Sequence, residues 1–132
     1  MKSSDATLFL TLQDVLEIHE ELISVYGGES GVRDLALLRS AIEMPRAGHA
    51  DGFLHESLFD MAAAYLFHLV QNHPFVDGNK RTGAATAIIF LTLNGVRIRN
   101  DENGLVDTTL SVIEGTLSKS DVSVFFESIS KR

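Results

Sequence analysis

The segment from His73 to Gly83 reads His-Pro-Phe-Val-Asp-Gly-Asn-Lys-Arg-Thr-Gly and concentrates the side chains of this chain that could do chemistry. His73 carries an imidazole, which exchanges protons near neutral pH and often serves as a general base. Asp77 carries a hard carboxylate, the kind of ligand with which proteins hold Mg²⁺ beside substrate phosphates. The segment therefore pairs a candidate base with a candidate metal ligand.

The residues after this carboxylate are suited to binding phosphate. Gly78 lets the backbone approach a ligand closely, and Asn79 is expected either to cap the next helix or to donate its side-chain amide. Lys80 and Arg81 add two positive charges at a helix start, where free N–H groups and the helix dipole already attract anions. Base, metal ligand and phosphate site together suit the transfer of a phosphate-containing group to a hydroxyl.

Lys80 and Arg81 stand where local stability favours the opposite charge. Cations at a helix N-terminus oppose the dipole, whereas Asp or Glu would be stabilised there. A residue choice that gives up local stability without visible compensation is typical of a functional site. The alternative interpretation, an ordinary solvated turn, explains each residue singly but not their occurrence together.

The elements that must position this segment are predicted to be helical, because apolar residues recur at helical spacing along nearly the whole chain. The helix before the segment is apolar nearly all round, so we expect it at the centre of the domain. It should end at His73, because the residue before a proline is pushed out of the α region. Four predicted helices have definite bounds: Leu12–Tyr26 after a Thr11 cap, Asp34–Met44, Glu56–Asn72 and Asn79–Leu93. A fifth is predicted from the in-register residues Val106, Leu110, Ile113 and Leu117. A sixth, after a Ser120 cap, is predicted from Val122, Phe125, Phe126 and Ile129.

The predicted fold class is all-α: one compact six-helix domain over residues 1–132. The polar stretch 45–55 is predicted to form a short flap before the central helix, which could include a small β-hairpin. Residues 96–99 could form a brief extended piece.

Composition narrows the classes of function. The net charge of −7 argues against direct binding of nucleic acid, and the absence of cysteine excludes thiol catalysis and cysteine-zinc sites. Histidines outside the segment form no i, i+4 pair, which argues against a metal centre built from them. No apolar run is long enough for a membrane span, and the polar N-terminus is unlike a signal peptide, so we expect a cytoplasmic protein with no membrane partner.

The segment resembles the signature of the Fic/Doc (Fido) superfamily, whose usual form is His-Pro-Phe-x-(Asp/Glu)-Gly-Asn-Gly-Arg-x-x-Arg. Two positions depart from it: Lys80 replaces a glycine, and Ala84 replaces the second arginine. The Asn-Lys-Arg-Thr version, the Gly-Gly-Glu-Ser-Gly-Val-Arg-Asp segment at 27–34 and the short chain resemble the Doc (death-on-curing) branch. The resemblance extends over about residues 8–130.

The resemblance implies a role for each residue of the segment. His73 would deprotonate the target hydroxyl, and Asp77 would hold Mg²⁺ through the phosphates of ATP or another nucleoside triphosphate. The flap would align the target peptide by strand addition. The other implied roles are nucleotide and phosphate binding by Gly78, Asn79, Lys80 and Arg81, and structural roles for Pro74 and for Phe75, which would anchor the loop in the core.

Doc proteins are toxins that a Phd-like antitoxin neutralises, and the member that names the branch phosphorylates elongation factor Tu. The resemblance therefore implies a toxin that phosphorylates a Ser or Thr hydroxyl of a target protein such as elongation factor Tu and so inhibits translation. A Fic-type AMP transferase is the main alternative. Lys80 crowds the pocket and Ala84 removes a γ-phosphate ligand, and both departures favour the kinase.

Two further alternatives are less favoured. A catalytically inactive binding scaffold would not need the intact His73, Asp77 and Arg81. A ribonuclease toxin would need a basic face with interleaved aromatic residues, which this acidic chain lacks.

Overall fold

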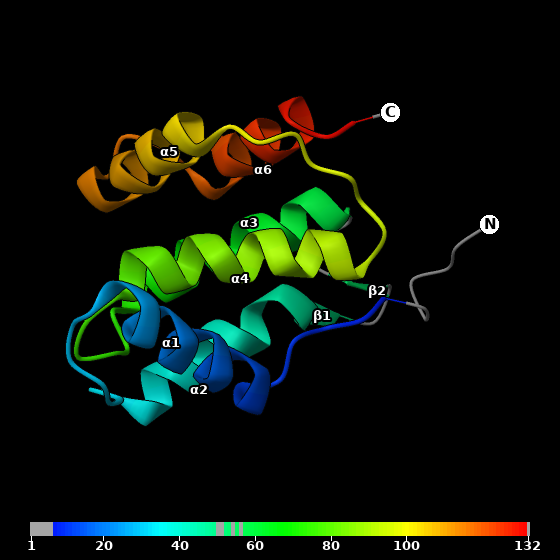
Figure 1. The fold of residues 1–132 in the computed structure, drawn as a ribbon. Helices are drawn as coiled ribbons and strands as arrows, with labels where there is room; N and C mark the ends of the chain where they lie inside the picture. Colours follow the sequence, from blue (N-terminus) through cyan, green and yellow to red (C-terminus); the bar gives the residue numbers. More distant parts are fainter. Residues whose placement is uncertain (1–6, 50–51, 54, 56, 132) are drawn as a thin grey trace.

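The structure is a computed structural model that describes residues 7–49, 52–53, 55 and 57–131. Within these residues the predicted all-α fold with six helices is confirmed, and Figure 1 shows their arrangement. No helix in this part of the chain is long and apolar enough to cross a membrane. The helices are α1 (Leu12–Tyr26), α2 (Leu35–Glu43), α3 (Leu58–Asn72), α4 (Asn79–Leu93), α5 (Glu102–Glu114) and α6 (Lys119–Ser128), with a 3₁₀ turn, η2 (Met44–Arg46), after α2.

The predicted cap of α1 is confirmed, and that of α6 is wrong. Thr11 accepts the backbone N–H of Asp14 at 3.1 Å, and the Asp14 carboxylate accepts the N–H of Thr11 at 2.8 Å. The same reciprocal arrangement of hydrogen bonds caps α6, where it is formed by Ser118 and Asp121. Ser118 rather than the predicted Ser120 is the cap because only Ser118 is followed three residues later by an acid.

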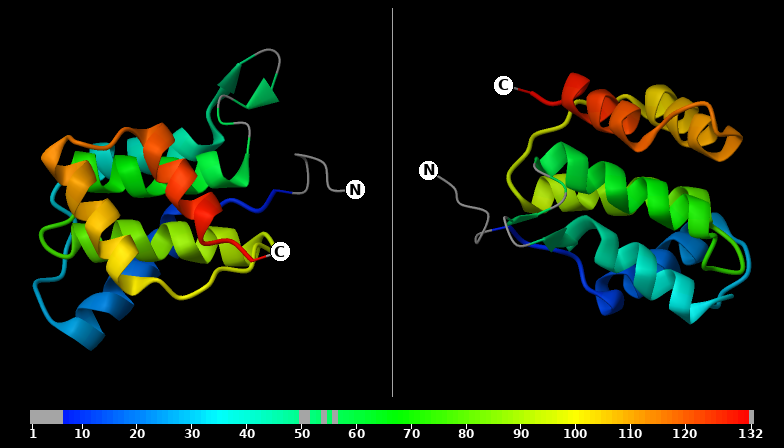
Figure 2. Two further views of the ribbon diagram at one scale, coloured as in Figure 1. Left: turned by 90° about the horizontal axis from the view of Figure 1, so that it is seen from above. Right: turned by 180° about the vertical axis from the view of Figure 1, so that it is seen from behind.

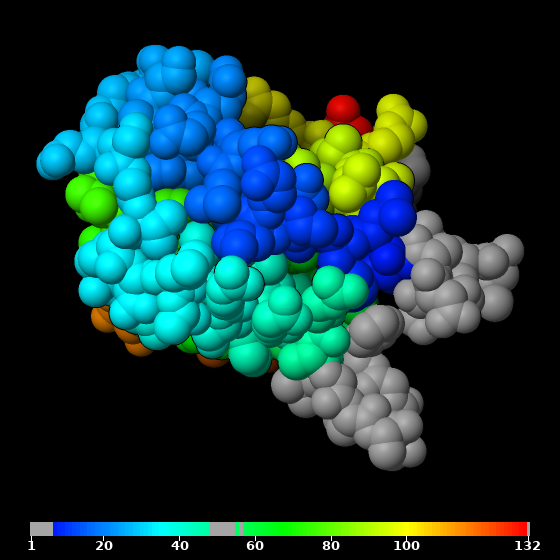
Figure 3. All heavy atoms as spheres, turned by 90° about the horizontal axis from the view of Figure 1, so that it is seen from below, coloured from blue at the N-terminus to red at the C-terminus, as the bar shows by residue number. Residues whose placement is uncertain are grey.

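Helix α3 is the centre of the molecule, as its apolar sequence predicts. Every residue from Met61 to Leu66 is buried, and α2, α4, α5 and α6 all pack against this helix. Gly83 lets α4 lie close to it, because a Cβ at that position would be 3.0 Å from Cγ2 of Val70. Figure 3 shows the face that α1 and α2 cover with the loop between them.

The predicted hairpin in the flap is confirmed within the described residues. Strands β1 (Gly48–His49) and β2 (Gly52–Phe53) pair antiparallel, with Gly48 opposite Phe53. Figure 2 shows them standing out from the helical body at the start of α3. The predicted start of α3 at Glu56 lies outside the described residues, and α3 begins at Leu58 after a Ser57 cap.

Apolar spacing located α5 but not its buried face. Thr108, Thr109 and Val112 face the core, whereas the predicted in-register residues Val106, Leu110 and Ile113 are exposed. The predicted extended piece at 96–99 is confirmed, because Ile98 forms an antiparallel bridge with Ser130.

Candidate active site

The residues with candidate chemistry lie in the loop from α3 to α4 and in the first turn of α4 (Figure 1). His73 is the C-cap of α3 and has left-handed backbone angles, φ 50° and ψ 53°, which confirms that the helix ends before the proline. Among the described residues it is the only non-glycine residue with positive φ. A non-glycine residue held in this conformation is strained, and such strain is common at functional sites.

The loop is anchored in the core by Pro74 and Phe75, which are both buried. The imidazole of His19, from α1, stacks on the ring of Phe75 with a centroid distance of 3.8 Å. His19 Nε2 also lies 2.8 Å from the carbonyl oxygen of Asp77. Because a carbonyl only accepts, Nε2 carries the proton, and His19 holds the loop at two points.

Asn79 closes the loop from the other side. Its side-chain Oδ1 accepts the N–H of Phe75 at 2.9 Å, and its Nδ2 donates to the carbonyl of Phe75 at 3.0 Å. The side-chain amide therefore donates to the backbone of its own loop, and the phosphate-binding role expected for Asn79 stays a prediction. The predicted capping is wrong, because the N-cap is Gly78, which has φ 81° and no side chain to offer the first amides of α4.

Arg33, in the α1–α2 loop, holds the backbone of the strained His73. Its Nε donates to the His73 carbonyl at 2.7 Å, and its Nη2 donates to the Asn72 carbonyl at 3.0 Å. The backbone N–H of Arg33 donates to the Pro74 carbonyl at 2.7 Å, and that of Val76 donates to the Gly31 carbonyl at 3.0 Å. Sequence reasoning assigned no role to Arg33, and its only signal was the resemblance of residues 27–34 to Doc chains.

The same loop positions the carboxylate of Asp77. Its Oδ2 accepts the backbone N–H of Glu29 at 3.2 Å, and its Oδ1 accepts that of Gly78 at 2.9 Å. Gly28 leaves the space for this contact, because a Cβ there would lie 2.7 Å from Oδ2. The carboxylate is fixed in direction, yet Asp77 remains exposed to solvent.

Asp77, Gly78 and Arg81 come together around a pocket of about 260 Å³. The guanidinium of Arg81 lies over the ring of Tyr26, 4.4 Å from its centroid, which is a cation–π contact. His73 and Lys80 are exposed and do not line the pocket. The remaining lining residues come from the end of α1 and the loop after it: Leu22, Ile23, Tyr26, Gly27 and Gly28.

The pocket fits a magnesium ion that is shared with phosphates, not one held by the protein alone. No group of three or more His, Cys, Asp or Glu side chains in the described part of the chain could hold a metal ion. Asp77 nevertheless presents hard oxygens beside the start of α4, and Mg²⁺ is often bound by one or two carboxylates together with substrate phosphates and water.

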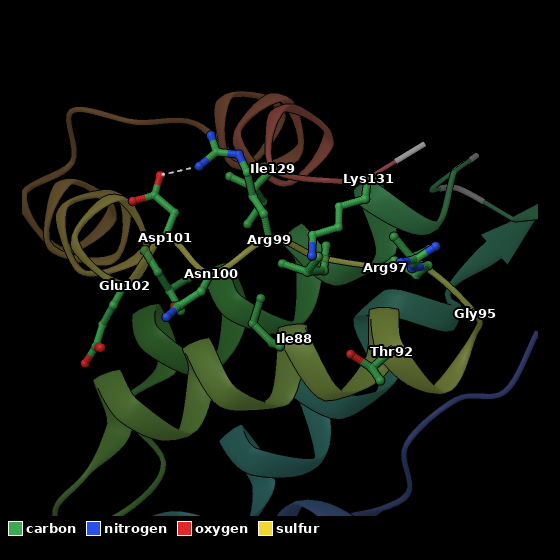
Figure 4. A pocket seen from close by; sticks show the side chains of 13 residues that line it. Ile88, Thr92, Gly95, Arg97, Arg99, Asn100, Asp101, Glu102, Ile129 and Lys131 are labelled. Atoms are coloured by element: carbon green, nitrogen blue, oxygen red, sulfur yellow. Dashed lines mark ion pairs between the residues drawn. The ribbon is translucent and has the colours of Figure 1, made fainter.

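A second pocket, of about 580 Å³, lies at the opposite end of α4. Figure 4 shows Ile88 and Thr92 of α4 on one side of it and Arg97, Arg99 and Lys131 on the other, with Arg99 turned toward Asp101. It contains no residue of the segment 73–81, so it is separate from the candidate active site.

Comparison with known proteins identifies the family of this chain. A model of the Fic/DOC family matches residues 9–91. The chain is 42% identical to "Toxin Doc" of Mycolicibacterium smegmatis over 72% of this chain and 71% of that protein. It is 33% identical to "Protein kinase doc" of Escherichia phage P1 over 84% of this chain and 86% of that protein. It is 34% identical to "Protein adenylyltransferase Fic" of Drosophila mojavensis, over 57% of this chain and 18% of that protein.

A six-helix fold with the His-Pro-Phe loop feeding the start of α4 defines a Fido-type domain. The chain belongs to the Fic/DOC family.

Proposed function

We propose that this chain is the toxin of a Doc/Phd-like toxin–antitoxin system and transfers a phosphoryl group to a Ser or Thr hydroxyl of a target protein in the cytoplasm. ATP or another nucleoside triphosphate would be the donor, and a Phd-like protein would be the antitoxin. The target would be a protein such as elongation factor Tu, whose modification would inhibit translation. One observation carries the proposal: Asp77, Gly78 and Arg81 meet around one pocket at the positive end of α4. The relatives named toxin Doc and protein kinase doc support it.

The pocket residues Asp77, Gly78 and Arg81 would share the chemistry with His73 and Lys80, which are exposed on the same loop and helix start but do not line the pocket. His73 would accept the proton of the attacking hydroxyl, while Arg33 keeps its backbone in place. Asp77 would hold Mg²⁺, which, when bound, neutralises charge on the phosphates. Lys80, Arg81 and the backbone amide of Asn79 would hold the phosphates themselves. The N–H of Gly78 donates to Oδ1 of Asp77, so it would bind a phosphate only by leaving that contact. The side chain of Asn79 is committed to Phe75, so Asn79 would contribute only its N–H.

Two residues favour phosphoryl over adenylyl transfer. Lys80 adds a charge where the usual signature has glycine, although it is exposed and does not line the pocket, so the crowding expected from the sequence is not seen. Ala84 is only partly exposed and offers no phosphate ligand where the usual signature has arginine. A nucleotide held without that arginine is more readily bound with its γ-phosphate toward the target hydroxyl. Adenylyl transfer is the second candidate, because the chain also resembles a protein named adenylyltransferase Fic.

Intact-mass measurement of the target distinguishes the two reactions. Purified elongation factor Tu, incubated with the chain, ATP and Mg²⁺, should gain about 80 Da by phosphoryl transfer, whereas adenylyl transfer would add about 329 Da. His73→Ala should abolish the gain while its thermal unfolding remains that of the unmodified chain. Arg81→Ala should weaken ATP binding by about tenfold or more, since a charge-assisted contact is lost.

Three outcomes would contradict parts of the proposal. An unchanged mass of elongation factor Tu, together with modification of another protein in a whole-cell extract, would overturn the proposed target. Full modification by His73→Ala would overturn the proposed base. If no protein in the extract gains either mass, the proposed transfer reaction itself is wrong.

A further inference from the structure

Helix α5 carries three large aliphatic side chains on its outer surface. Val106, Leu110 and Ile113 are 51%, 40% and 47% exposed. Their i, i+4, i+7 spacing places them on one side of the helix, and we call them the α5 apolar stripe. Single exposed apolar residues are ordinary, but an aligned set on one element is typical of a protein-binding surface.

The buried face of α5 is less apolar than this stripe. Its buried residues are Thr108, Thr109 and Val112, and the partly buried Leu105 packs against the core beside them. The Thr109 hydroxyl donates within its own helix, to the Leu105 carbonyl at 2.8 Å. If burial within this chain alone decided how α5 is rotated, the larger aliphatic side chains would face the core, because their burial stabilises more. Burial of apolar surface alone therefore does not account for the rotation of α5.

Two contacts fix the rotation of α5. A Cβ at Gly104 would lie 2.9 Å from Cε1 of Phe125, so glycine allows α5 and α6 to approach closely at this point. On the side facing α3, Gln71 donates its side-chain amide to the Val112 carbonyl at 2.8 Å. Rotating α5 so that the stripe faced inward would break both contacts. These contacts therefore keep the stripe exposed.

The charged side chains of α5 itself are all negative. Glu102, Asp107 and Glu114 are exposed, and α5 contains no Lys or Arg. None of the three carboxylates forms an ion pair with another described residue. Packing this face against the same face of a second copy would bring like charges together in a chain of net charge −7, which opposes self-association. A basic partner would be attracted instead.

We propose that the α5 apolar stripe is a docking surface for an amphipathic helix of a basic partner protein. That helix would set apolar side chains at i, i+4 and i+7 against the stripe, as ridges pack into grooves. Lys or Arg residues beside them would meet Asp107 and Glu114. The stripe contains no residue of the segment 73–81, so this inference goes beyond the proposed transfer reaction and does not depend on it.

A synthetic peptide serves as the probe. It is about 18 residues long, enough to cover α5, with Leu at i, i+4, i+7 and i+11 in an Ala background and Lys on both sides of the Leu row. A second peptide has the same Leu residues and Glu in place of every Lys. Fluorescence anisotropy of the labelled peptides with the full chain should show saturable binding of the Lys peptide and at least about tenfold weaker binding of the Glu peptide.

Two valine variants test whether the peptide binds at the stripe. Val106→Ser removes an apolar side chain from the stripe, and Val124→Ser makes the identical change at a 65% exposed valine of α6. Val106→Ser should weaken binding of the Lys peptide about tenfold, and Val124→Ser should leave it unchanged. Circular dichroism melting of both variants checks that each remains folded.

Four outcomes would overturn the proposal. The first is no saturable binding of the Lys peptide, and the second is equal binding of the Lys and Glu peptides. The third is equal weakening by Val106→Ser and Val124→Ser. The fourth is a dimer, seen by analytical ultracentrifugation, that Val106→Ser dissolves, because the occupant would then be a second copy of this chain.

Discussion

The imidazole of His19 lies nearly parallel to the ring of Phe75, with centroids 3.8 Å apart and planes at 6°. The same imidazole donates from Nε2 to the carbonyl of Asp77 at 2.8 Å. His19 belongs to α1, so one buried side chain connects the first helix to two points of the loop that carries the candidate metal ligand. Its hydrogen bond acts on the backbone of Asp77, which leaves the carboxylate free to face solvent.

His19→Phe should separate the two contacts of this residue. Phenylalanine can still stack on Phe75 but cannot donate to the Asp77 carbonyl, so ATP binding in the presence of Mg²⁺ should weaken about three- to tenfold, the usual worth of one hydrogen bond. Isothermal titration calorimetry measures this change. His19→Ala removes the stacking as well and should also lower the free energy of unfolding by about 2–4 kcal/mol. Unchanged ATP affinity in His19→Phe would show that the hydrogen bond does not position the site.

Gly28 and Gly27 offer a matched pair of substitutions. Both have positive φ, +112° and +88°, but a Cβ at Gly28 would lie 2.7 Å from Oδ2 of Asp77, whereas one at Gly27 has no atom within 4 Å. Each change to alanine should therefore cost about 1 kcal/mol of stability through backbone strain. Only Gly28→Ala should displace the Asp77 carboxylate and weaken ATP binding in the presence of Mg²⁺, by about tenfold. Equal loss of ATP binding in both variants would mean that loop strain, not the carboxylate, is responsible.

Asn79→Asp should destabilise the fold although it only replaces the side-chain NH2 group by an oxygen. The carboxylate keeps an acceptor for the Phe75 N–H, but it presents a second acceptor to the Phe75 carbonyl, which needs a donor. Because Asn79 is 6% exposed, we expect a loss of about 2 kcal/mol, the penalty for a buried unsatisfied group. Urea denaturation measures it, with Asn103→Asp on the exposed face of α5 as the control. Similar midpoints for the two variants would contradict the assigned contacts.

The stability of the fold should fall as the pH decreases from about 6.5 toward 4, because of His68. Its Nε2 lies 2.9 Å from Nζ of Lys119. Burial, followed by the charges of Lys119 and His55, lowers the pKa of His68 from 6.5 to about 4. Between these values the unfolded chain binds a proton that the folded chain does not, so protonation favours unfolding. The loss should be about 1–2 kcal/mol, since the ring is only partly buried.

His68→Gln keeps a hydrogen-bond acceptor near Lys119 but does not titrate. Urea denaturation at pH 7 and pH 4.5 should therefore show a smaller loss of stability for this variant than for the unmodified chain. A residual loss is expected from His55, whose pKa is also lowered, chiefly by burial. Equal losses in the variant and the unmodified chain would show that His68 is not the group responsible.

The sequence by itself determined where the helices lie and which segment carries the chemistry. Apolar spacing, a Thr11 cap with an acid three residues on, and the His73-Pro74 stop all act within a few residues, so they can be recognised without knowing the fold. Phe75, deep in the core, agrees with the anchoring role that the Fic/Doc resemblance implies. These local signals placed the His-Pro-Phe loop at the start of α4 before any contact was known.

Only the tertiary structure decided how that loop is held and which face of α5 is buried. The contacts that orient Asp77 come from Glu29, 48 positions earlier, and from His19, 58 positions earlier. The rotation of α5 depends on Gln71 and on the fit of Gly104 against α6. Periodicity records which side chains share a helix face but not what covers that face. Residues distant in sequence determine which helix face is buried, because packing depends on positions in space.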